Sequence, residues 1–276
     1  MQNPIGIEDA EAVAPAPQKA PVRARDLLAA KARASGVHFT LSLVIASAVF
    51  LAIYFIWYPG ALFSAAGGRG LLTIIFLVDV TLGPVLTFIV FKRGKKSLVF
   101  DLSVIALVQL AALCYGVHAV FLARPAYIAF VKDRFDLAVA ADLSPKELEK
   151  ARGSGYERIP LDGPRVVAVR IPSDPEESMR IAQDALAGGP DLYGYPRFYR
   201  PYGEVKDDVL RVARPVAELG RFNAAEDVAR ELARAGQPAE TLRFVPMRAT
   251  VRDLAVLVDA RTAAVVRISG LRPWPY

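Results

Sequence analysis

Residues 71–123 read LLTIIFLVDVTLGPVLTFIVFKRGKKSLVFDLSVIALVQLAALCYGVHAVFLA, two apolar runs on either side of a short basic segment. Asp79 interrupts the first run, and Asp101 precedes the second. Each run is long enough to cross a membrane, because about 20 helical residues span a hydrocarbon core of about 30 Å. A further apolar run lies just upstream. The sequence therefore predicts three transmembrane helices, at residues 37–58, 71–91 and 102–123.

The chain divides into three regions of different composition. Residues 1–36 are rich in Ala and Pro and are predicted to form a largely disordered tail, with a short basic helix as an alternative for its last part. Residues 37–123 form the predicted membrane domain. Residues 124–276 resemble a globular α+β domain, because helix start signals alternate with β-branched segments. Two of these segments, 253–259 and 263–268, are separated by a short polar turn and predict a C-terminal antiparallel hairpin.

Basic residues predict the orientation in the membrane. The loop between the second and third runs carries four of them, Lys92, Arg93, Lys95 and Lys96, whereas the loop before the second run carries only Arg69. Cytoplasmic loops are enriched in Lys and Arg, and such clusters also contact anionic lipids. We therefore expect a bacterial inner-membrane protein with its N-terminus in the cytoplasm and residues 124–276 in the periplasm.

Charge and residue types limit the chemistry that is expected of residues 124–276. They hold 24 Lys and Arg against 22 Asp and Glu, a net charge of +2, which does not indicate nucleic-acid binding. They contain neither Cys nor His, so thiol or histidine nucleophiles and the usual zinc ligands are excluded there. No catalytic residue, metal site or cofactor is predicted.

Asp79 is the first candidate functional residue. A carboxyl group near the middle of a membrane costs about 3 kcal/mol, so it should face protein rather than lipid. It lies about 18 Å from the cytoplasmic end of its helix, and Tyr115 lies at nearly the same depth as a candidate hydrogen-bond partner. Gln109 and Ser47 are weaker candidates. Asp79 either fixes the helices of the bundle, docks a helix of another protein, or belongs to an ion or proton path.

A second candidate site lies in residues 191–204, DLYGYPRFYRPYGE, where aromatic residues and arginines alternate. Tyr and Arg are enriched at binding hot spots. This pattern fits a partner-binding surface, a loop that is held by its own aromatic side chains, or a glycan contact. The candidate residues are Tyr193, Tyr195, Arg197, Phe198, Tyr199, Arg200 and Tyr202.

Several sequence blocks resemble the type IV pilin accessory proteins of the TfpX/TfpZ group. The blocks are WYPGALF, then LVDVTLGPVLTFIVFKRGKKSLVFDLSVIALVQLAALCYG, ARPAYIAFVKDRFDL, GGPDLYGYPRFYRPY and DLAVLVDARTAAVVRISGLRPWPY. The similarity runs from about residue 36 to the end of the chain. It implies an inner-membrane, chaperone-like accessory factor that helps a type IV pilin subunit to accumulate or assemble, and it implies no catalytic residues.

Two other classes of function remain open from the sequence. One is a membrane-tethered sensor, although the short cytoplasmic segments offer no output domain. The other is a cell-envelope enzyme that would use carboxylates such as Asp133, Asp136 and Asp142. A deep polar cleft around these residues would favour the enzyme.

Overall fold

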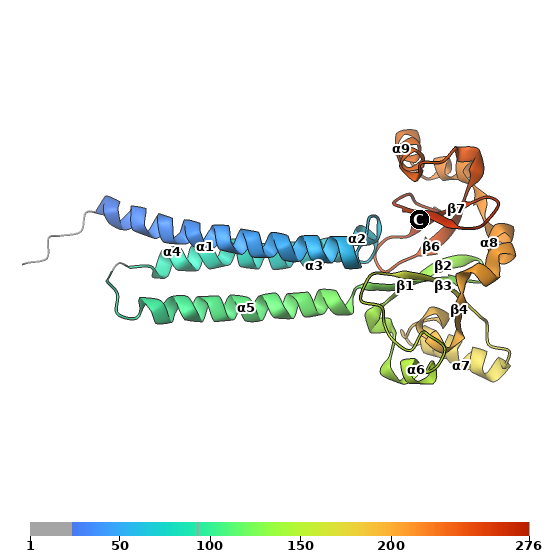
Figure 1. Ribbon diagram of the computed structural model, residues 1–276, viewed down its shortest axis with the longest axis horizontal. Coiled ribbons are helices and arrows are strands. Elements are labelled where there is room, and N and C mark those ends of the chain that lie inside the picture. Colours follow the sequence, from blue (N-terminus) through green and yellow to red (C-terminus); the bar gives the residue numbers. More distant parts are fainter. Residues whose placement is uncertain (1–23, 93, 276) are drawn as a thin grey trace, which may run out of the picture.

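The computed structural model describes residues 24–92 and 94–275, which form a helical bundle joined end-on to an α+β part (Figure 1). Three helices are long and apolar enough to cross a membrane: Ala24–Trp57, Gly68–Val90 and Leu98–Leu122. The first includes α1 (Ala24–Ala52) and a π-helical turn at Ile53–Trp57. The third is α5 (Leu98–Leu122).

The middle helix has an irregular centre. It consists of α3 (Gly68–Leu77), a π-helical turn at Val78–Leu82 that contains Asp79, and α4 (Gly83–Val90). Pro84 lies in the first turn of α4, where it lacks the N–H that would continue the regular hydrogen-bond ladder. Ser35 on α1 donates to the carbonyl oxygen of Pro84 at 2.8 Å. A π turn inside a helix is frequent at functional sites, and here it surrounds the buried acid.

The short helix α2 (Leu62–Ala65) and the helix ends connect the bundle to the α+β part. The buried Tyr58 hydroxyl donates to the carbonyl of Val120, which ties the first helix to α5 at 2.9 Å. The Trp57 indole N–H donates to the carbonyl of Leu161, and the amide of Val251 donates to that of Ala65. Two loops of the α+β part therefore contact the end of the bundle directly.

The α+β part is built on an eight-stranded mixed sheet in the order β4-β3-β1-β2-β6-β7-β8, with β5 paired to β6. β1 is parallel to β3, β2 is parallel to β6, and the other pairs are antiparallel. β7 and β8 are antiparallel neighbours at one end of this sheet, so the predicted hairpin is part of a larger structure. The strands are β1 (Pro125–Val131), β2 (Arg134–Val139), β3 (Arg165–Val169), β4 (Tyr199–Pro201), β5 (Arg214–Pro215), β6 (Leu242–Arg248), β7 (Leu254–Asp259) and β8 (Val265–Ser269).

Both faces of the sheet are covered. Phe130, Phe135 and Met247 form a core with Tyr58 and Leu62 from the end of the bundle. Tyr127 and Val169 belong to a second core with the aromatic segment 191–204, and Phe244 and Leu257 belong to a third beside α9. The covering helices are α6 (Pro145–Lys150), α7 (Pro175–Leu186), α8 (Lys206–Val212) and α9 (Ala225–Ala235).

Candidate functional site

Asp79 is buried between the helices, with 7% of its surface exposed. Its Oδ1 atom has no hydrogen-bond partner among the described residues. Its backbone carbonyl accepts a hydrogen bond of 3.1 Å from the Gln109 side chain of α5. Gln109 reaches this carbonyl because Gly83 has no side chain: a Cβ there would lie 2.1 Å from Gln109 Nε2. The glycine thus allows α5 to satisfy the irregular centre of the middle helix.

Asp79 lines two grooves. One, of about 380 Å³, lies between α3 and α5 and includes Tyr115 and Gly116. The other, of about 170 Å³, lies between α1 and α5 and includes His38 and Ser42. Both grooves are otherwise mostly apolar, so Asp79 is the acidic residue between two grooves, one on either side of α5.

The two helices α1 and α4 are linked by polar contacts toward the loop that carries the basic cluster. His38 Nδ1 lies 2.6 Å from Thr87 Oγ1, and Lys31 Nζ donates to the carbonyl of Ile89. The sequence analysis did not identify these contacts. In the sequence, only the position of each residue along its own helix could have pointed to these pairs, since the two helices run antiparallel.

The predicted hydrogen bond between Tyr115 and Asp79 is absent from the described residues. Tyr115 is 77% exposed and lies beside Asp79 along the same groove. Gln109, the weaker candidate in the sequence, makes the contact to the Asp79 residue. Tyr115 and Asp79 line the same groove, but the Tyr115 side chain is exposed instead of bonded to Asp79.

The basic cluster lies in the connection between α4 and α5. Lys92, Lys95 and Lys96 are exposed, whereas Arg93 lies outside the described residues. Asp101 pairs with Lys95 at 2.6 Å and accepts a hydrogen bond from Ser97. Asp101 is thus held by Lys95 and Ser97 at the start of α5.

The aromatic segment 191–204 lies mostly inside its own core. Tyr195, Phe198 and Tyr199 are buried, and the Tyr199 hydroxyl donates to the carbonyl of Tyr193. Burial, together with a hydrogen bond to Asp184, raises the pKa of Tyr195 to about 12, so its phenol is a neutral donor. This is the arrangement of a segment that is held by its own aromatic side chains.

Arg197 explains the arginine content of this segment. Its guanidinium pairs with Glu147 of α6 and with Glu177 of α7, the latter at 2.9 Å. The same group lies 4.7 Å from the centre of the Phe198 ring and 5.1 Å from that of Tyr195. Arg197 thus joins two helices to the segment from within. Arg200 is half-buried on β4, and Tyr202 donates to the carbonyl of Ala263.

The carboxylates that an enzyme would use have structural partners. Asp136 accepts from Arg134 at 3.1 Å and from Arg248 at 2.9 Å. Burial raises the pKa of Asp136, and the two arginines oppose that rise. Asp142 accepts the backbone N–H of Val139. These contacts use the carboxylates to fix turns and strands, and no group of three metal-ligating residues occurs in the described parts of the chain.

The family model of fimbrial assembly protein FimB matches residues 26–60, which lie on the first helix and its exit. The fimbrial assembly protein of serogroup I from Dichelobacter nodosus is 33% identical over 221 residues, covering 78% of this chain and 85% of the relative. The chain belongs to the family of fimbrial assembly proteins.

Two further relatives of this fimbrial assembly family come from the same organism. The serogroup E1 protein is 32% identical over 221 residues, covering 78% of this chain and 85% of its own length. The protein of serogroups C1 and C2 is 37% identical over 122 residues, covering 44% of this chain and 93% of its own. No solved structure matches the chain.

Proposed function

We propose that this protein is an inner-membrane accessory factor of type IV fimbrial biogenesis, which binds a pilin subunit and stabilises it during assembly. Its relatives, which are all named fimbrial assembly proteins, support a role in fimbrial assembly. The three long apolar helices support a membrane location. The proposal describes a binding protein, with no reaction carried out on the pilin.

The proposed orientation follows from charge. Lys92, Lys95 and Lys96 are exposed at the end of the bundle far from the α+β part, and basic loops favour the cytoplasm. The opposite end of the bundle carries the sheet (Figure 1). Residues 124–276 would then form the periplasmic domain, where they can meet the globular part of a subunit whose apolar helix lies in the membrane.

Asp79 carries the proposal. A carboxyl oxygen that has no partner in a membrane costs free energy, and a polar group from a neighbouring helix recovers part of it. Both grooves beside Asp79 could accept a helix of another protein, because they are lined mostly by apolar and small residues such as Ala112 and Gly116. A pilin helix that offers an N–H or O–H donor at this depth would complete the site.

Two substitutions test the contact, Asp79→Asn and Asp79→Ala. Hydrogen bonds between membrane helices contribute about 1 kcal/mol, so we expect pilin co-purification to fall about three- to tenfold with Asp79→Ala, together with the pilin level in cells. Asp101→Asn is the matched control, because Asp101 is an acid of the same bundle that already pairs with Lys95.

The result separates the two roles of Asp79. Unchanged pilin levels and unchanged co-purification in both Asp79 variants would leave it as a residue that only packs the bundle. An equal loss in the Asp101→Asn control would indicate general damage to the helices. The orientation is tested separately, by the accessibility of single cysteines placed at Lys96 and at Arg152 in a Cys114→Ser background.

A further inference from the structure

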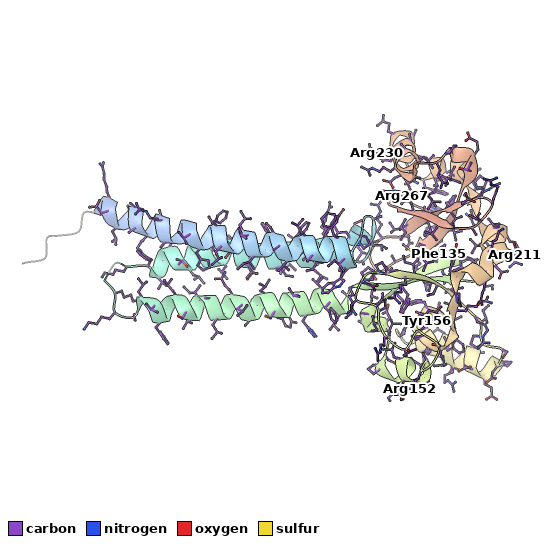
Figure 2. All side chains as sticks on the ribbon, in the orientation of Figure 1. Phe135, Arg152, Tyr156, Arg211, Arg230 and Arg267 are labelled. Carbon is purple, nitrogen blue, oxygen red and sulfur yellow. The ribbon has the colours of Figure 1, made fainter. Side chains whose placement is uncertain are left out.

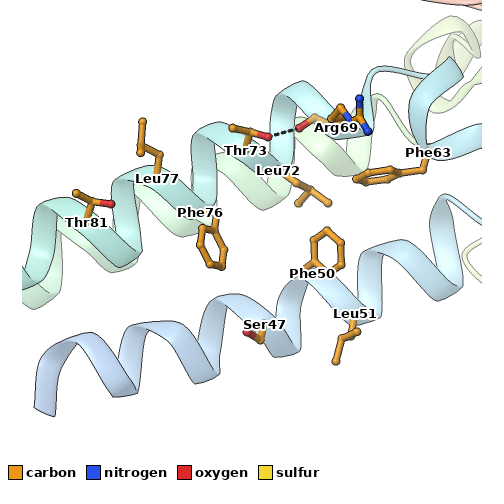
Figure 3. Close-up of a pocket in the computed structure, with 10 residues that line it drawn as sticks. All are labelled: Ser47, Phe50, Leu51, Phe63, Arg69, Leu72, Thr73, Phe76, Leu77 and Thr81. Carbon is orange, nitrogen blue, oxygen red and sulfur yellow. Dashed lines mark hydrogen bonds between the residues drawn. The ribbon is translucent and has the colours of Figure 1, made fainter. Parts of the chain in front are cut away.

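A third groove, of about 760 Å³, lies between α1 and α3 near the end of the bundle that adjoins the α+β part. Figure 3 shows Phe50 of α1 and Leu72 and Phe76 of α3 pointing toward one another across it. The remaining lining residues are Ser47, Leu51, Phe63, Arg69, Thr73, Leu77 and Thr81. This groove does not contain Asp79 and has no part in the pilin contact proposed above.

Arg69 gives the groove a cation at one end only. It lies in the first turn of α3, beside Phe63, and its side chain is exposed (Figure 3). No carboxylate among the described residues pairs with its guanidinium, whereas Arg124 at the same end is buried against Phe121. Arg69 therefore keeps its charge available at the level where the apolar helices begin.

The length of the groove fits one leaflet of a membrane. From Arg69 to Thr81 the helix rises about 18 Å, and half of a hydrocarbon core is about 15 Å. The cation thus lies at headgroup depth, and the apolar wall of Leu72 and Phe76 extends toward the membrane centre. A guanidinium binds phosphate well because its planar N–H groups match two phosphate oxygens.

We infer that this groove binds one anionic phospholipid from the leaflet on the α+β side, with its phosphate on Arg69 and an acyl chain along Phe50, Leu72 and Phe76. A guanidinium without a carboxylate favours a lipid with a net negative charge over a zwitterionic one. The lipid fills the apolar space that the two helices leave between them, and so holds α1 and α3 at a fixed separation near the junction with the sheet.

The test measures lipids that remain bound to the full chain. The protein is reconstituted with equal amounts of phosphatidylglycerol and phosphatidylethanolamine, extracted in a mild detergent and examined by native mass spectrometry. We expect one phosphatidylglycerol to be retained. Arg69→Gln should weaken that retention about tenfold, because it removes a charge-assisted hydrogen bond to the phosphate. It should also remove the preference for phosphatidylglycerol over phosphatidylethanolamine.

A second variant tests the apolar part of the site without changing charge. Ser47→Phe places a ring in the groove and should displace the lipid, whereas Ser103→Phe adds the same ring on the exposed side of α5 and should not. Arg252→Gln is the charge control, since it removes an exposed cation of the α+β part whose guanidinium hydrogen-bonds to the carbonyl of Gly270.

Three results would overturn the inference. Retention that is unchanged in both Arg69→Gln and Ser47→Phe means that the lipid binds elsewhere. Displacement by inorganic phosphate alone means that the groove contributes no acyl contact. Displacement by a co-purified pilin means that a protein helix is the occupant. Loss of pilin binding in Asp79→Ala with lipid retention intact would leave this site independent of the proposed function.

Discussion

Two buried aspartates show how differently the two parts of the molecule treat charge. Asp136, 1% exposed, lies in the sheet between Arg134 and Arg248, and Asp191 pairs with the same two arginines. Asp79, 7% exposed, has no ion pair among the described residues. Each of the two aspartates has one buried carboxyl oxygen without a hydrogen-bond partner, so they differ in their ion pairs. The α+β part gives its buried aspartate two arginine partners, whereas the bundle gives Asp79 none among the described residues.

Ion pairs also occur on the surface of the α+β part. In Figure 2, Arg152, Arg211 and Arg230 extend outward from its helices, while Phe135 lies inside. Each of the three arginines pairs with an acid three residues before it, at 2.6 to 3.0 Å. Such exposed pairs contribute little stability. Of the two buried aspartates, the one without an ion pair among the described residues, Asp79, lies in the long apolar helices.

The largest effect on the free energy of unfolding is expected from a substitution of Asp136. Asp136→Ala should lower the free energy of unfolding by about 2 to 3 kcal/mol, because it leaves two arginines without their shared carboxylate; both retain some contact with water, which limits the loss. Asp79→Ala should change it by less than about 1 kcal/mol, since no ion pair is broken. Thermal unfolding of the full chain in detergent measures both. Equal losses would remove the distinction.

Arg197 tests whether the aromatic segment is held from within. Arg197→Met should cost about 2 kcal/mol, because two glutamates lose their shared cation and two rings lose a cation–π contact. Arg180→Met is the control, since Arg180 also approaches Glu177, at 3.6 Å, but is largely exposed. A loss as small as that of the control would mean that the segment does not depend on Arg197 for its position.

A substitution at Gly116 tests how closely α3 and α5 must pack beside Asp79. A Cβ on Gly116 would lie 2.6 Å from Ile75 Cγ1, whereas Gly70 has nothing within 4 Å. Gly116→Val should therefore lower stability by about 1 to 2 kcal/mol through overpacking, and Gly70→Val should be neutral or slightly stabilising. The helical signal on heating measures both. Equal behaviour would mean that α5 is free to move away from α3.

The three apolar helices were predictable from length and apolar composition, and the family blocks along residues 36–276 pointed to the family. The start of the first helix was not: α1 begins at Ala24, inside the tail that was predicted to be largely disordered. The strand β2 was not predicted, since Arg134 and Asp136 interrupt its apolar pattern. Those two residues are compatible with a buried strand only because Arg248, more than a hundred positions away, shares the carboxylate. A contact of that range leaves no local signal.

The candidate residues also divide into those with a local sequence signal and those whose setting depends on distant residues. Asp79 was identified from the cost of a charge in a membrane, which depends on its own segment alone. The pattern of residues 191–204 left open a partner surface, a glycan contact and a segment held by its own aromatic side chains. The contacts that hold the segment, of Tyr195 with Asp184 and of Arg197 with Glu177, come from another helix and have no local signal. The Arg69 groove had no signal in the sequence beyond a single cation in a loop, because its walls come from two helices.

The smallest effect is expected at the turn between β7 and β8. Asp259 Oδ1 accepts hydrogen bonds from the amides of Arg261 and Thr262 and from the Thr262 hydroxyl, at 2.8 to 2.9 Å. These bonds lower the pKa of Asp259. A lowered pKa in the folded state means that the carboxylate stabilises the fold above its unfolded pKa of about 3.9, and that this contribution is lost as the pH falls further.

Asp259→Asn keeps the acceptor oxygen but removes the charge, so the variant should melt slightly below the unchanged chain at pH 7. As the pH falls through the lowered pKa of Asp259, the carboxyl group of the unchanged chain becomes protonated too, and the two melting temperatures should converge. A difference that stays constant with pH would assign the effect to turn geometry instead of charge. Convergence would show that even an exposed acid of the α+β part is committed to its own backbone, which is the opposite of what is proposed for Asp79.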